Sequence, residues 1–302
     1  MYKYIFYKII TCLFIALEAA IVRYLSGGSS IYLYEKLSVY AIIFFQSLFS
    51  VLFLFFILKK YIFKLFMSSF VFLNFFRAVL NIFGIGLWYL SLQKIPVIQV
   101  ISVSFISPII SVFGAIFFFK EKLTLKSIVI VITSFIGFFF SMRPDFLWKQ
   151  IYNFNIILLL PLCASFCMAV SKILVRKLMI FKHSPWQLIV CLFSLIIPIC
   201  LIFFFKYGWI FPKYYHWFWL ILLGVLNICI NYFFAKSYIL GDIITLLPFG
   251  IAAKLIFAGS ISFYLFNEIT NSFPIIMGFL IGLCNFILLF YNYIFYYFIK
   301  FK

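Results

Sequence analysis

Residues 96–119 read PVIQVISVSFISPIISVFGAIFFF, an apolar run that holds no charged residue and ends at Lys120 and Glu121. A helix needs about 20 mainly apolar residues to cross a bilayer, so this run is long enough for one span. Similar runs lie on both sides of it, and together they predict about ten transmembrane helices. We place these spans near residues 5–25, 38–58, 72–92, 96–119, 124–142, 154–174, 185–205, 215–235, 243–266 and 274–298.

The composition of the 302-residue chain points to the same class of protein. Hydrophobic residues make up 68% of it and charged residues 10%, whereas a soluble domain carries about 25% charged residues. A soluble enzyme or binding module is therefore excluded. The runs have helical length and lack the alternating pattern of a membrane barrel. The predicted fold is an all-α polytopic membrane protein.

The formal net charge of +18 is explained by membrane topology rather than by nucleic acid. Lys and Arg gather in the short polar gaps between apolar runs, where the positive-inside rule and anionic lipid headgroups account for them. With the amino terminus inside, fifteen of these residues fall on the cytoplasmic side, Lys172 among them, and seven on the other side. We therefore expect both termini in the cytoplasm, lipid as a partner and no binding of nucleic acid.

The two halves of the sequence echo each other. Residues 114–121 (GAIFFFKE) and 261–268 (ISFYLFNE) are both apolar runs that end in Glu before the next span, at an offset of 147 residues. Each half then holds five spans, and an odd number inverts the second copy in the membrane. Inverted repeats are typical of secondary transporters. The predicted repeats are residues 1–147 and 148–302.

The motifs resemble a known family. In the first half they are Arg77–Leu80, Trp88-Tyr89, Pro96, Ser104–Pro108, Lys120–Thr124, Gly137 and Arg143-Pro144; in the second half they are Leu247–Phe249, Lys254–Ala258, Phe266–Glu268 and Gly278. The pattern resembles two EamA domains of the drug/metabolite transporter superfamily, closest to the bacterial S-adenosylmethionine uptake transporters. Two elements depart from it. In the second half, Leu255 occupies the position that corresponds to Pro108 in the first half. Gly250 follows the pair Pro248-Phe249, where the family often has an acidic residue.

Glu18 is the only acid well inside a predicted span. An ionisable group there is costly unless it faces a cavity or a partner. One interpretation is a structural ion pair with Arg23 or Arg77, because buried charges are normally paired. The other is functional, with Glu18 attracting a substrate cation or carrying a coupled proton.

Two cations also lie within apolar runs. Arg77 either holds a substrate carboxylate or extends to the cytoplasmic headgroups, depending on where its helix begins. Lys254 is far from both ends of its run, so we expect it to face a cavity.

Further candidate binding residues are neutral. Asn81 and Trp88 share a helix face with Arg77 and are followed by Tyr89, a pattern that fits a lined cavity. Trp88 also fits an interfacial aromatic belt. Gln99 and Asn231 are polar residues within spans, where the alternative is a hydrogen bond between helices.

Metal and cofactor chemistry finds no support in the sequence. The seven cysteines lie in apolar runs without metal spacing, and no glycine-rich loop ends in Gly-Lys-Ser/Thr. We expect no cofactor and no catalytic residue. Gly278–Gly282 permits close helix approach, within the chain or with a second copy, so a homodimer stays open.

The sequence therefore predicts a secondary carrier that moves a small polar metabolite by alternating access. The resemblance implies uptake of S-adenosylmethionine across a bacterial inner membrane, in exchange for S-adenosylhomocysteine. Glu18 is then expected to face the sulfonium or amine, Arg77 and Lys254 the carboxylate, and Trp88 and Tyr89 the adenine. The alternatives are a proton-coupled exporter of amino acids, amines or drugs and, more remotely, a membrane-embedded transferase.

Overall fold

All regular structure in the described part of the chain is helical, which confirms the all-α class. The structure, a computed structural model, describes residues 2–28, 36–59, 71–104, 106–120, 159–180, 184–207, 211–240 and 243–266, with the single residues 128, 132 and 157. Its helices are α1 (Tyr2–Ser26), α2 (Val39–Leu58), α4 (Val71–Lys94), α5 (Val97–Val103), α6 (Ile106–Phe119), α9 (Leu159–Ile180), α10 (Pro185–Tyr207), α11 (Tyr214–Leu240) and α12 (Ile243–Phe266). The spans expected at 124–142 and 274–298 lie outside the described residues, apart from positions 128 and 132.

The helices have the length and surface of membrane spans. Among the described residues, six helices are long and apolar enough to cross a bilayer. Large apolar side chains face outward on one of these helices and on the shorter apolar helices: Phe72 of α4 is 80% exposed, Phe117 of α6 82% and Tyr264 of α12 80%. Such a surface suits lipid and not water. The chain is a multi-pass membrane protein.

Two helices rather than one cover the span expected at 96–119. α5 ends at Val103, and α6 begins at Ile106. The sequence explains this interruption, because Pro108 has no N–H to donate to the carbonyl four residues earlier. The Ser104 carbonyl accepts instead from the Ser107 N–H at 3.0 Å. In the second half Leu255 replaces the proline, and α12 runs through without a break.

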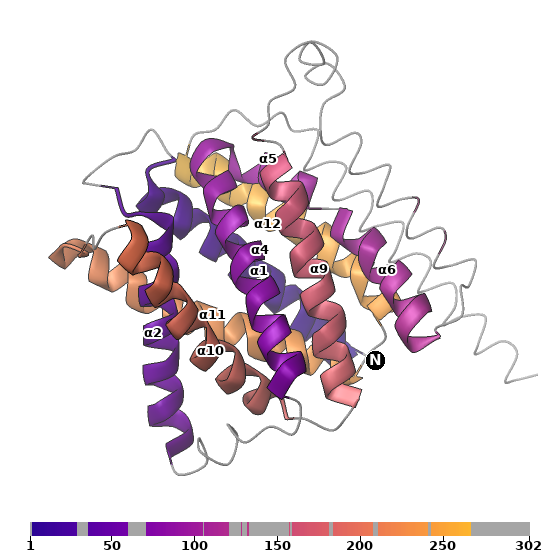
Figure 1. Cartoon of the computed structure of the whole chain (residues 1–302). Coiled ribbons are helices and arrows are strands. Elements are labelled where there is room, and N and C mark those ends of the chain that lie inside the picture. The colour runs from indigo at the N-terminus through magenta and orange to yellow at the C-terminus, as the bar shows by residue number, and fades with distance from the viewer. Residues whose placement is uncertain are drawn as a thin grey trace, which may run out of the picture.

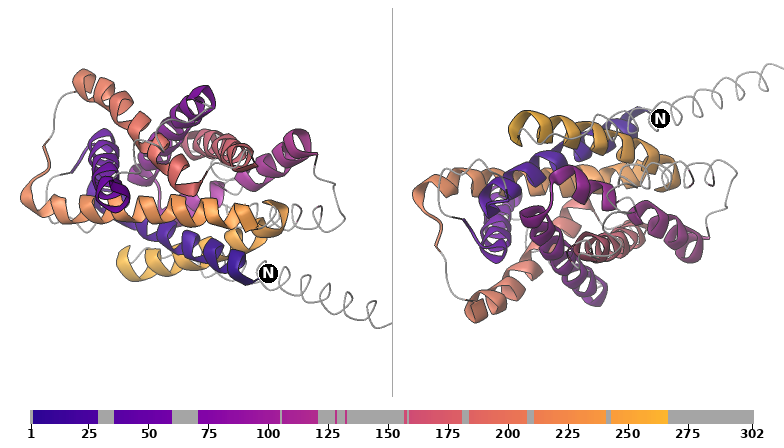
Figure 2. Two further views of the ribbon diagram at one scale, coloured as in Figure 1. Left: turned by 90° about the horizontal axis from the view of Figure 1, so that it is seen from below. Right: turned by 90° about the horizontal axis from the view of Figure 1, so that it is seen from above.

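Helices from the two halves of the sequence pack against each other. α4 lies along α9, as Figure 1 shows, and α1 lies alongside both α11 and α12, as both views of Figure 2 show. α2 contacts α10 and α11, and these contacts between halves are more extensive than those within the first half. A cavity enclosed by this bundle is therefore built from both halves.

Two glycines allow close approaches between the halves. A Cβ at Gly84 would lie 2.9 Å from the Met168 side chain, where α4 meets α9. A Cβ at Gly224 would lie 2.7 Å from the Phe49 Cβ, and the Gly224 carbonyl accepts a hydrogen bond from Ser50 at 3.0 Å. These positions fix the spacing between the halves.

Candidate substrate-binding site

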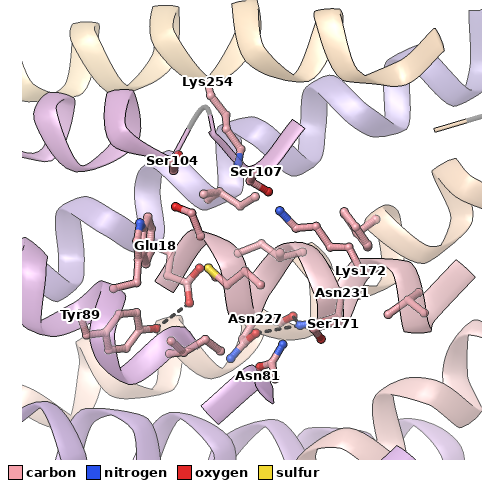
Figure 3. A pocket seen from close by; sticks show the side chains of 18 of the residues that line it. Glu18, Asn81, Tyr89, Ser104, Ser107, Ser171, Lys172, Asn227, Asn231 and Lys254 are labelled. Carbon is pink, nitrogen blue, oxygen red and sulfur yellow. Dashed lines mark hydrogen bonds between the residues drawn. The ribbon is translucent and has the colours of Figure 1, made fainter. Parts of the chain in front are cut away.

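A polar cavity lies between the halves. The non-atom space within it is about 980 Å³, a figure that includes space open to the exterior. Its walls come from α1, α4, α5, α6, α9, α11 and α12 (Figure 3). Seven of the eight residues predicted from the sequence line it: Glu18, Arg77, Asn81, Trp88, Tyr89, Asn231 and Lys254. The eighth, Gln99, is half-buried on α5 and does not line this cavity.

Glu18 sits in a buried hydrogen-bonded ring that joins three helices. Its Oε1 accepts from the Tyr89 hydroxyl of α4 at 2.6 Å and from the Gln46 amide of α2 at 3.1 Å. The Tyr89 oxygen also lies 2.7 Å from the Gln46 Oε1. Glu18 is 7% exposed, Gln46 1% and Tyr89 0%. The ring therefore binds α1, α2 and α4 together at the edge of the cavity.

When Glu18 is ionised, the three side chains of this ring hold one proton fewer than their three hydrogen-bond contacts need. The single Tyr89 hydroxyl proton then faces two acceptors, Glu18 and Gln46, and satisfies one of them. With a proton on Glu18, each of the three side chains donates once and accepts once. The arrangement can thus take up and release one proton with a change in its hydrogen bonds.

The two arginines do not pair with Glu18. Arg77 is 3% exposed, and its Nη1 donates to the Leu188 carbonyl of α10 at 3.1 Å. Arg23 donates to the carbonyls of Leu92 and Ile95. The interpretation of Glu18 as half of an ion pair is therefore wrong, as is the extension of Arg77 to headgroups. The Arg77 Nε has no partner among the described residues.

Two lysines reach the cavity from different helices. Lys254 comes from α12 and Lys172 from α9, and Figure 3 shows both side chains directed into the cavity. Lys172 stands eight residues before the end of α9. The expected span end at 174 is six residues too early, because the helix runs on to Ile180; the assignment of Lys172 to the cytoplasmic side stays a prediction.

Asparagines line the opposite wall. Asn231 donates to the Asn227 Oδ1 and carbonyl on α11, each at 2.9 Å. The Asn81 Oδ1 is buried without a partner in the described part of the chain, so it can accept from a ligand. Trp88 is 5% exposed, which places it inside the bundle rather than in an interfacial belt.

Several lining residues were not among those predicted. Lys172 adds a second cation to the lining. Gln46 does not line the cavity but orients Glu18, and neither residue carried a local signal for these roles. The others are small and common within membrane helices: Ser107, Ser165 and Ser171. Pro108, a visible signal of helix interruption, pointed to the segment that contains Ser104 and Ser107.

A family model matches the first half of the sequence. The model described as the EamA-like transporter family aligns with residues 3–143. This part of the chain is an EamA domain. The EamA domain supplies Glu18, Arg77 and Tyr89 to the cavity, whereas Lys172 and Lys254 come from the half that follows.

Relatives of this chain carry the names of two different transporters. A riboflavin transporter of Vibrio cholerae serotype O1 is 31% identical over 57% of this chain and 56% of its own length. The chain thus spans less than two thirds of that relative. An S-adenosylmethionine uptake transporter of Rickettsia prowazekii is 25% identical over 78% of each protein.

The fold itself matches over nearly the whole chain. A solved crystal structure of a protein, 12% identical in sequence, superposes with a TM-score of 0.63 over 93% of both chains. The architecture therefore extends through the second half, beyond the residues of the EamA domain.

Proposed function

We propose that this protein is a secondary transporter of a bacterial inner membrane that takes up S-adenosylmethionine by alternating access. Bacterial relatives with transporter names and the position of the cavity between the two halves support transport. Secondary transporters built from repeats bind their substrate at the interface between them.

The charge of the cavity carries the choice of substrate. Lys172 and Lys254 make no hydrogen bond or ion pair among the described residues, although both line the cavity. An uncompensated charge inside a membrane bundle is costly, so a substrate that compensates it binds with advantage. S-adenosylmethionine offers a carboxylate, an amine for the free Asn81 oxygen, and an adenine for the surface beside Trp88.

Riboflavin is the second candidate, because the named relative with the higher identity carries that substrate. Its ring system and sugar alcohol chain are neutral near pH 7. Binding of riboflavin would bury both ammonium groups of Lys172 and Lys254 without an opposite charge. S-adenosylmethionine carries, besides its amine and sulfonium charges, a carboxylate that can pair with one of these ammonium groups, and riboflavin has no such group.

Two energy sources suit the geometry. Exchange of S-adenosylmethionine for S-adenosylhomocysteine needs no ion gradient, because both molecules share the amino acid and adenosine parts. Coupling to protons would use Glu18, whose ring with Tyr89 and Gln46 gains or loses one proton. The second route belongs to the alternative of a proton-coupled exporter.

Uptake into proteoliposomes tests the proposal. Labelled S-adenosylmethionine, riboflavin and amino acids are supplied in turn, with S-adenosylhomocysteine preloaded or absent and with a proton gradient imposed or absent. We expect uptake of S-adenosylmethionine that rises on preloading. Saturable uptake of riboflavin alone, or export of amino acids that requires the proton gradient, contradicts it. Liposomes without protein and liposomes with Lys213→Ala serve as controls.

A further inference from the structure

The two cavity lysines repel each other. The groups that act electrostatically on Lys172 are Lys254, Lys8 and the Cys12 thiol. Those that act on Lys254 are the same thiol, which donates to the Gly250 carbonyl, and Lys8. No carboxylate appears in either set, and Glu18 is held by Tyr89 and Gln46. In the described part of the chain, Lys172 and Lys254 therefore face the cavity without a carboxylate partner.

Aromatic and backbone groups do not replace the missing anion. The Lys172 ammonium lies 5.9 Å from the centre of the Phe234 ring, and Lys8 lies 4.8 Å from the same ring. Such a contact supplies about 0.5–2 kcal/mol, less than the cost of a bare charge within a membrane bundle, about 2.5 kcal/mol or more. Both lysines therefore retain binding capacity for an anion.

A buried hydroxyl completes the set of donors. Ser107 is 7% exposed, lines the cavity, and its hydroxyl makes no hydrogen bond among the described residues. It lies in the first turn of α6, directly after the break at Ser104. Figure 3 shows the side chains of Lys254, Ser107 and Lys172 extending into the same part of the cavity. The amino end of a helix favours negative charge, and interrupted helices of transporters use it in this way.

We infer that Lys172, Lys254 and Ser107 form an anion-binding subsite that takes the carboxylate or phosphate group of the transported molecule. The inference rests on the proposed function only in that the bound molecule is transported. The subsite itself is defined by its three donors. Its occupant bridges α9, α12 and the start of α6, so it joins helices from both halves. Metabolites that lack an anionic group leave the two ammonium groups uncompensated and are rejected.

The first experiment needs no knowledge of the substrate. The melting temperature of the purified full chain is measured in detergent with inorganic phosphate and, at equal ionic strength, with chloride. We expect phosphate to raise Tm by about 2 to 4 °C at several times its Kd. Lys172→Met and Lys254→Met should lose the rise, Lys254→Arg should keep it, and Lys213→Met should match the wild type. Detergent without lipid excludes a headgroup as the source of the effect.

The second experiment compares S-adenosylmethionine with its decarboxylated form in proteoliposomes. We expect the wild type to discriminate about 10- to 100-fold against the decarboxylated molecule, as for loss of a hydrogen bond to a charged group. Lys172→Met and Lys254→Met should weaken uptake of S-adenosylmethionine and leave uptake of the decarboxylated form unchanged. The discrimination between the two molecules is then lost.

The outcomes separate the subsite from the proposed substrate. Phosphate stabilisation that depends on the lysines, without uptake of S-adenosylmethionine, keeps the subsite and removes the substrate. Robust uptake of both molecules, with no effect of phosphate, keeps the substrate and overturns the subsite. If neither uptake nor stabilisation occurs, both proposals fall.

Discussion

Removal of the Tyr89 hydroxyl is the sharpest probe of how α1, α2 and α4 are held together. Tyr89→Phe deletes the hydroxyl oxygen and leaves the aromatic ring of the side chain in place. Tyr89 has no exposed surface, so water cannot replace the lost contacts at 2.6 Å to Glu18 and 2.7 Å to Gln46. Hydrogen bonds between membrane helices contribute about 0.6 kcal/mol on average and about 1.7 kcal/mol at most. For two contacts we expect a loss of about 1 to 3 kcal/mol in the free energy of unfolding.

Unfolding of the purified protein by SDS in mixed micelles, followed by circular dichroism, measures this loss. The matched control is Tyr24→Phe in α1, because the Tyr24 hydroxyl makes no hydrogen bond among the described residues and its ring packs 5.6 Å from Trp219. The control should unfold like the wild type. If Tyr89→Phe is as stable as Tyr24→Phe, the hydrogen-bonded ring of Glu18, Tyr89 and Gln46 does not hold the three helices together. Its role in the site must then be abandoned.

Three further predictions concern transport and topology. Lys254→Ala should weaken the apparent binding free energy in uptake by about 2 to 5 kcal/mol, because the substrate anion loses a buried partner. The control Lys213→Ala, at an exposed residue, should be nearly silent. Equal effects of the two substitutions in an uptake assay contradict a role of Lys254 in the cavity. Glu18→Gln should lower the affinity for substrate at every pH if Glu18 contacts a substrate cation. If Glu18 instead carries a coupled proton, the substitution should chiefly flatten the pH dependence of uptake. Normal uptake across mildly acidic to mildly alkaline pH refutes both roles. Single cysteines beside Glu121 and Glu268 should be labelled from the cytoplasm and from the opposite face respectively, since five spans invert each repeat; labelling of both from one side rules out the ten-span topology.

The residues that could be predicted are those whose chemistry conflicts with their surroundings. Glu18, Arg77 and Lys254 stand out because an ionisable group in an apolar run demands a reason. Helical periodicity then carried the prediction from Arg77 to Asn81 and Trp88 on the same face. This logic works within one helix, because spacing along the sequence fixes direction around the axis.

The residues that could not be predicted depend on boundaries or on distant partners. Lys172 was placed near a span end because the apolar run was cut at 174, and six more helical residues move it inside. Gln46 is one of many polar residues in spans, and only packing of α2 against α1 and α4 brings it to Glu18. Gln99 shows the opposite error, since short α5 turns it away from the cavity.

The break at Pro108 makes the two halves mechanically unequal. Inverted repeats can reach two end states by exchanging shapes, which would leave those states equal in energy if the repeats were identical. Here the first half has an interruption between α5 and α6, while α12 in the second half is one helix, although it contains Pro248. If the halves are inverted repeats, we expect more bending in the first, so that the two end states differ in free energy even without substrate. An empty carrier of this kind is then expected to rest with its opening mainly toward one side of the membrane, and Pro108 contributes to that bias.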